Sequence, residues 1–166
     1  MKELMDNLTE TLKNMVSVYK DILQIALDKK EYIISGDIDK LETVIYRERN
    51  LAENILLLEQ RRRYVMQSIN KNIGESGKPP TLRELIKQVR EPYKSEIKKQ
   101  HETISDIVMK VEEVNKVNTS LTKYSLEYIN NFIKSICKES LDDSTYQQSG
   151  KRKDPEFKRM MIEVSA

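Results

Sequence analysis

The chain has 166 residues, of which 34% are charged and 38% hydrophobic, with four Gly, four Pro and no Trp. This composition is typical of a helix-rich, coiled-coil-like protein and argues against a sheet protein. The 29 Lys and Arg residues nearly balance the 27 Asp and Glu residues and leave a net charge of +2, so the charge gives no reason to expect nucleic acid or an anionic membrane as a partner.

Cysteine usage and hydropathy predict the compartment. The single Cys137 permits no internal disulfide and points to a reducing environment. The N-terminal residues MKELMDNL lack an apolar signal core, and nowhere do 18 apolar residues run together. We therefore expect a soluble cytoplasmic protein without membrane insertion.

A long helix is predicted from Lys2 to Ser35. Its apolar residues recur at spacings of three and four: Leu4, Leu8, Leu12, Met15, Tyr19, Ile22, Ala26 and Ile33. Gly36 follows as a C-terminal stop. Asp37 or Asp39 is suited to cap the next helix.

The second predicted helix ends near Ile73 and lies antiparallel to the first, because the turn between them is short. Its predicted seam consists of Ile38, Leu41, Ile45, Glu48, Ala52, Ile55, Arg62, Val65, Ile69 and Ile73, with Val44, Leu51 and Leu58 beside it.

The sequence GESGKPP then forces a loop. After it, Thr81 and Glu84 are spaced for a capping box, in which the Thr81 hydroxyl caps the helix start and Glu84 reaches back to the Thr81 N–H. A short helix is predicted from Leu82 to about Arg90. Pro92 separates it from the next helix, and we expect the short helix to act as a lid on one end of a bundle.

The longest predicted helix runs from Pro92, as its first helical residue, to about Glu139, or roughly 70 Å. Two interleaved seven-residue repeats follow it: Ile97, Ile104, Val111, Asn118, Ser125 and Phe132, and His101, Val108, Asn115, Thr122, Ile129 and Ile136. Such repeats are typical of left-handed helix packing. The sequence thus predicts an all-α fold, an elongated antiparallel bundle of three long helices plus one short helix. The bundle domain should cover residues 1–140 and a flexible tail residues 141–166.

The long helix is expected to overshoot its shorter neighbours. An overhang would expose the turns from Leu121 to Cys137, which are apolar over much of their circumference: Leu121, Leu126, Tyr128, Ile129, Phe132, Ile133 and Ile136. A contiguous exposed apolar patch marks a partner site. The alternative is that the lid, the tail or a second subunit covers these turns.

No catalytic site is predicted. The one histidine, His101, excludes a di-iron site with two Glu-x-x-His pairs, and one His with one Cys cannot supply a zinc site. The string SGK matches a phosphate loop over three letters only, and Leu41 and Glu42 are incompatible with a calcium loop. We expect no enzyme activity, cofactor or metal.

Three stretches of the chain stand out together: ERNLAENILLLEQRRR (Glu48–Arg63), NKVNTSLTKYSLEYI (Asn115–Ile129) and TYQQSG (Thr145–Gly150). They resemble the FlgN-type flagellar export chaperones. They occur in the family's order and, together with the three-helix layout, cover essentially the whole domain.

The resemblance implies a cytoplasmic type III export chaperone for hook-filament junction (hook-associated) proteins. Such chaperones bind the C-terminal helical region of the substrate, prevent premature assembly and deliver it to the export gate. The implied substrate-binding residues are Asn115, Asn118, Leu121, Leu126, Ile129 and Phe132, to which the apolar pattern adds Ile133 and Ile136. Tyr146 matches a tail tyrosine that docks on the cytoplasmic domain of the gate.

Two alternatives stay open at this point. Asn115 and Asn118 suit register control by hydrogen bonding either with a substrate helix or within the bundle itself. The same heptads would also serve a structural or signalling coiled-coil homodimer with no export substrate, and the pattern leaves open whether the free protein dimerises through the overhang.

Overall fold

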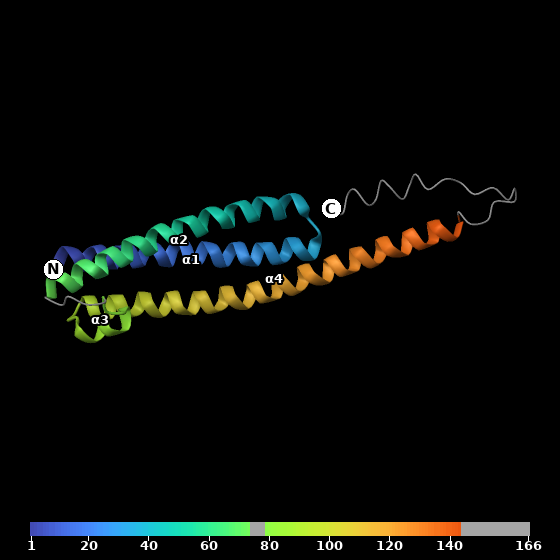
Figure 1. The fold of residues 1–166 in the computed structure, drawn as a ribbon. Coiled ribbons are helices and arrows are strands. Elements are labelled where there is room, and N and C mark those ends of the chain that lie inside the picture. The colour runs from blue at the N-terminus through green and yellow to red at the C-terminus, as the bar shows by residue number, and fades with distance from the viewer. Residues whose placement is uncertain (74–78, 144–166) are drawn as a thin grey trace. The chain divides into compact units, whose positions relative to one another are not determined.

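The computed structural model of the chain describes residues 1–73 and 79–143, the last six of these by their backbone alone. These residues form four helices, α1 (Lys2–Ser35), α2 (Ile38–Ile73), α3 (Leu82–Gln88) and α4 (Tyr93–Asp143) (Figure 1). No strand occurs within the described ranges. The predicted all-α class, with three long helices and one short one, is confirmed.

The turn between α1 and α2 follows from two residues. Gly36 has φ 68° and ψ 23°, the left-handed conformation that glycine adopts without steric cost. The Oδ1 atom of Asp37 accepts a hydrogen bond of 3.1 Å from the backbone N–H of Lys40, so Asp37 caps α2. Hydrogen bonds from the Lys40 side chain and backbone also hold the pKa of Asp37 below its usual value.

Ion pairs show how α1 and α2 lie against each other within the first part of the chain. Glu10 pairs with Arg61 at 3.8 Å, and Lys29 pairs with Glu48 at 2.7 Å. Early residues of α1 therefore contact late residues of α2, and late residues contact early ones. The two helices run in opposite directions, as Figure 1 also shows.

Contacts between α1 and α4 follow the same order along both helices. Lys13 pairs with Glu96 at 3.1 Å, and the side chain of Asn118 contacts the backbone of Ala26. Up to Asn118, α4 thus runs in the direction of α1. The left-handed, antiparallel coiled-coil packing of the bundle as a whole stays a prediction.

The main core joins all four helices at the end where the chain starts. It consists of Met5, Leu8, Leu12, Met15, Val65, Met66, Ile69, Leu85 and Ile97. Leu85, the one fully buried residue of α3, is 1% exposed, so α3 packs on the core as the predicted lid does. The predicted capping box is also present, with Glu84 and Thr81 bonded to each other's backbone N–H groups.

The boundaries around Pro92 differ from the prediction. α3 ends at Gln88, because Val89 is extended (φ −83°, ψ 143°) and its side chain packs against the core. α4 begins at Tyr93, and the carbonyl of Pro92 accepts a bond of 3.4 Å from Glu96 N–H. Pro92 therefore precedes the helix, and α4 continues to Asp143, past the expected Glu139.

The predicted seam of α2 is wrong in its first half. Ile38 and Ile45 are 61% and 51% exposed, and Ala52 is exposed as well. The row that faces α1 instead includes Val44, which is 3% exposed, and the half-buried Leu51. A strict seven-residue spacing drifts by about 20° per repeat on a straight helix, which moves the row away from the core.

The chain divides into two compact units, Met1–Thr122 and Lys123–Ala166, and α4 passes through the division. The domain boundary expected at residue 140 and the overhang of α4 stay predictions. The tail expected over residues 141–166 lies outside the described residues from 144 onward.

Candidate partner-binding face on the last helix

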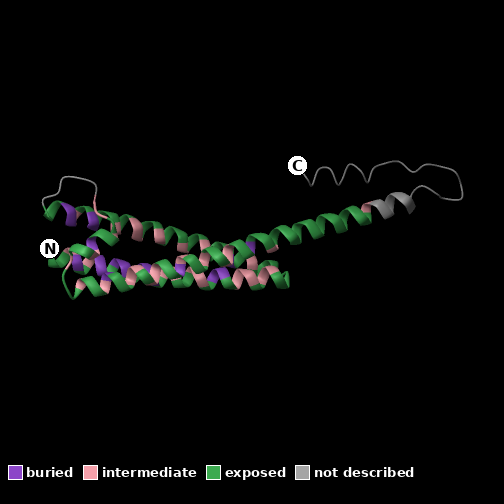
Figure 2. Cartoon of the chain, turned by 90° about the horizontal axis from the view of Figure 1, so that it is seen from below, coloured by how far each residue is buried: buried purple, intermediate pink, exposed green. Residues whose placement is uncertain are grey.

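An apolar face lies on α4 beyond Asn118. We call it the distal face and define it as Leu121, Leu126, Ile129, Phe132, Ile133 and Ile136. Leu121 is half-buried, and the other five side chains are exposed by 45–58%. Figure 2 shows this part of α4 as exposed along its length up to the last described side chains. The distal face spans about four helical turns, or roughly 23 Å.

The distal face continues the side of α4 that is buried earlier in the helix. Residues seven apart on a helix differ by only about 20° in direction. Along one such row, Asn118 is 4% exposed, whereas Phe132, two repeats later and turned by about 40°, is 58% exposed. Phe132 therefore lies close to the direction in which Asn118 is buried.

The opposite side of this segment is polar. It carries Lys123, Glu127, Asn130, Asn131, Lys134 and Ser135. An amphipathic segment of this kind stabilises its helix by covering the apolar side with another element. Among the side chains described after Asn118, none is buried.

Asn118 acts within the first unit. Its side-chain Nδ2 donates a hydrogen bond of 2.9 Å to the backbone carbonyl oxygen of Ala26, and its backbone carbonyl oxygen accepts one of 2.9 Å from Thr122 Oγ1. This contact fixes how α4 lies along α1 and favours the internal-register alternative for Asn118. Its role in substrate binding stays a prediction.

Two side-chain oxygen atoms that can accept hydrogen bonds lie next to the start of the distal face. The Oδ1 atoms of Asn115 and Asn118 are buried and have no hydrogen-bond partner among the described residues. A buried acceptor without a donor is costly. A partner that reaches this part of α4 and donates to either oxygen would remove that cost, so the predicted role of Asn115 is compatible with the structure.

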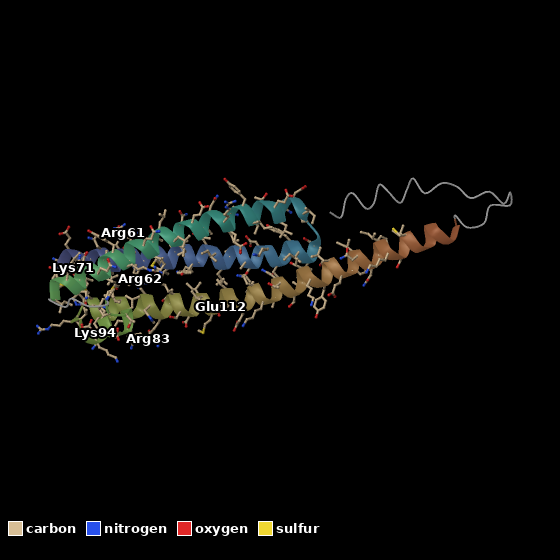
Figure 3. The ribbon with its side chains drawn as sticks, in the orientation of Figure 1. Arg61, Arg62, Lys71, Arg83, Lys94 and Glu112 are labelled. Carbon is tan, nitrogen blue, oxygen red and sulfur yellow. The ribbon has the colours of Figure 1, made fainter. Side chains whose placement is uncertain are left out.

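Two arginines of α2 form ion pairs with carboxylates. Figure 3 shows Arg61 and Arg62 on α2. Arg61 pairs with Glu10, and Arg62 forms three hydrogen bonds with the Glu59 carboxylate, the shortest being 2.8 Å. In residues 1–73 and 79–143 no group of three or more His, Cys, Asp or Glu side chains is placed to hold a metal ion.

Sequence analysis missed a second exposed apolar surface, which lies on α2. We call it the outer face of α2 and define it as Ile38, Ile45, Tyr46, Leu56, Leu57 and Tyr64, whose exposures range from 51% to 70%. The doubled pairs Ile45-Tyr46 and Leu56-Leu57 were the available signal, because one core-facing stripe cannot accommodate both members of each pair.

Comparison with known proteins decides the family. The family model described as "FlgN protein" matches residues 1–154. The chain belongs to the FlgN family. The match includes the whole first unit, the second unit up to residue 154 and the distal face, and it confirms the resemblance seen in the sequence. No curated protein and no solved structure matches the chain.

FlgN-family membership indicates a chaperone role in flagellum assembly. In the part of this FlgN-family chain that the structure describes, no helix has the length and apolar content needed to cross a membrane. Tyr146, the predicted gate-docking residue, falls within the family match and lies outside the described residues.

Proposed function

We propose that this FlgN-family protein is a cytoplasmic export chaperone that binds the C-terminal helical region of hook-filament junction proteins. Binding would prevent premature assembly, and the chaperone would deliver its substrate to the cytoplasmic domain of the export gate. The observation that supports this most directly is the distal face, an apolar side of α4 that is exposed by 45–58% at five of its six residues.

The chemistry of the distal face suits an amphipathic helix as its ligand. From Leu126 to Ile136 each of its residues has another member three or four positions away, which is the pattern of a helix that contacts a second helix along one side. The polar residues opposite keep the rest of the segment solvated. In this proposal the first unit is an antiparallel, left-handed bundle, and the apolar side of α4 after Asn118 binds the substrate.

The size of the face sets the affinity that apolar contacts can supply. Burying the exposed fractions of its five open side chains would contribute roughly 4–8 kcal/mol before the costs of association. A contribution of that size alone corresponds to binding no tighter than about micromolar. Such an interaction holds a substrate and still permits its release at the export gate.

Delivery would use a different part of the chain. By family resemblance Tyr146 docks on the export gate, and it lies ten residues after Ile136, the last residue of the distal face. Separate segments for substrate and gate would let the chaperone hold its cargo while it docks. The proposal assigns no catalytic step, cofactor or metal to the chain.

Coexpression tests the proposal. The full chain is coexpressed with the C-terminal helical segment of a hook-filament junction protein and measured by size-exclusion chromatography with light scattering. We expect a one-to-one complex. A chaperone chain that elutes without the segment, whatever its own oligomeric state, would contradict the proposal and favour a coiled-coil protein with no export substrate.

A further inference from the structure

The outer face of α2 has no assigned role. Seven large apolar side chains of α2 are more than a third exposed. Six of them form the outer face of α2, and the seventh, Ile73, is the last residue of the helix. None of them belongs to the distal face. Exposed apolar residues grouped on one helix mark a contact surface.

The six residues are placed symmetrically about Leu51. Ile38 and Tyr64 lie 13 residues before and after it, Ile45 and Leu57 six residues, and Tyr46 and Leu56 five residues. Each residue of the outer face of α2 on one side of Leu51 therefore has a counterpart within that face at the same distance on the other side.

Two pairs of exposed charged residues show the same symmetry with opposite signs. Arg49 and Glu53 lie two residues before and after Leu51, and Asp39 and Arg63 lie twelve residues before and after it. Arg49 and Glu53 are 78% and 65% exposed and make only a loose pair of 3.6 Å within their own helix. An exposed pair of this kind can exchange partners at little cost.

These two symmetries fit a second copy of the chain. In a two-fold dimer, the α2 helices of the two copies can run antiparallel across the axis. A residue at a given distance before Leu51 in one copy then lies beside the residue at the same distance after Leu51 in the other copy. We propose that the outer face of α2 binds α2 of a second copy, with the two-fold axis passing near Leu51. Apolar residues then meet apolar residues, and Arg49 meets Glu53 of the second copy.

The charges exclude the parallel arrangement of the same helices. With the helices parallel and in register, Arg49 would lie beside Arg49 of the other copy, and Glu53 beside Glu53. The antiparallel arrangement replaces both repulsions with attractions. The contact would be one helix wide and about 39 Å long, which is at the small end of specific interfaces, so the dimer should dissociate on dilution into the low micromolar range.

The first test measures the mass of the full chain by sedimentation equilibrium as a function of concentration. We expect a monomer–dimer equilibrium that Leu57→Glu weakens by at least tenfold, because the change occurs twice in the dimer. Met109→Glu is the matched control, since Met109 is 56% exposed on α4 and lies outside the outer face of α2. We expect it to dimerise as the unaltered chain does.

Charge exchange makes the test specific. Arg49→Glu and Glu53→Arg should each weaken the dimer, and the double variant R49E/E53R should restore it, because opposite charges again meet across the axis. Circular dichroism checks that every variant keeps its helices. A chain that stays monomeric up to about 100 μM, or a dimer that Leu57→Glu does not weaken, would overturn the proposal.

Spin labels test the orientation. In a Cys137→Ser background, a label at Ala52→Cys should lie about 3 Å along the axis from its copy, and a label at Gln60→Cys about 27 Å. We therefore expect strong dipolar broadening from position 52 and a long distance from position 60. Short distances at both positions would show a parallel pair and contradict the proposed dimer.

Discussion

Replacing Phe132 with aspartate should abolish substrate capture without unfolding the chaperone. Phe132 lies in the middle of the distal face and is 58% exposed. Its ring would be covered when a substrate helix docks, so the substitution removes apolar contact and places a carboxylate in the interface. Phenylalanine and aspartate have similar intrinsic helix propensities, so α4 should keep its helicity.

The expected loss has two parts. Fully burying a phenylalanine side chain contributes about 1.5–3 kcal/mol, and the exposed 58% corresponds to roughly 0.9–1.7 kcal/mol, or about a 4- to 20-fold weaker complex. Covering an unpaired carboxylate costs at least another 1–3 kcal/mol. Phe132→Ala should show the first part alone, and Phe132→Asp, with both parts, should bind about 25- to 3,000-fold more weakly than the unaltered chain.

The assay is titration calorimetry with the C-terminal helical segment of a junction protein, with circular dichroism for helicity. Tyr124→Asp is the matched control, because Tyr124 is 67% exposed on the same segment and lies outside the distal face. Equal losses for the two aspartate variants would mean that charge anywhere on this segment disturbs binding. Unchanged capture by Phe132→Asp would refute the reasoning.

Three further predictions concern the other parts of the chain. Asn118→Ala should lower the free energy of unfolding by about 1–2 kcal/mol in urea denaturation, because the 2.9 Å bond to Ala26 is lost, whereas the exposed Thr119→Ala should change it by less than about 0.5 kcal/mol. Gly36→Ala should cost about 1 kcal/mol in the same assay. Apart from Gly36 and its two chain neighbours, no described residue has an atom within 4 Å of the added methyl group, so the cost comes from the φ of 68°, and Gly36→Asn should recover part of it. Tyr146→Ala should leave substrate capture intact in a pull-down and weaken binding to the gate's cytoplasmic domain. Equal loss of both activities would contradict a separate docking role.

The helix boundaries could be predicted because local residues determine them. Gly36 stops α1 through its own conformation, Asp37 caps α2, and Thr81 with Glu84 starts α3. The sequence placed the end of α3 at Arg90, two residues late, because it does not show that the core draws Val89 out of the helix.

The core-facing side of α2 could not be predicted in the same way. Two apolar rows run along this helix, one through Ile38 and Ile45 and one through Val44 and Leu51, and the sequence pattern allows either to face α1. The structure places Val44 inside and Ile45 outside. This choice depends on contacts such as Lys29 with Glu48, which lie 19 residues apart and leave no local signal.

At the candidate site, too, local patterns could be predicted from the sequence and long-range contacts could not. The apolar residues of the distal face are visible as a pattern, because too many of them occur in four turns for one internal seam. The role of Asn118 was open, because its hydrogen bond reaches Ala26, 92 residues earlier in the chain. Only the fold brings these two residues together.

Hydrogen–deuterium exchange of the full chain, with and without the C-terminal helical segment of a junction protein, tests the central claim most directly. The account predicts that amides from about Leu121 to Ile136 exchange quickly in the free chain and become protected in the complex, while the amides of α2 change little. Protection confined to α1 and α2, or unchanged exchange along the distal face in a confirmed complex, would contradict it.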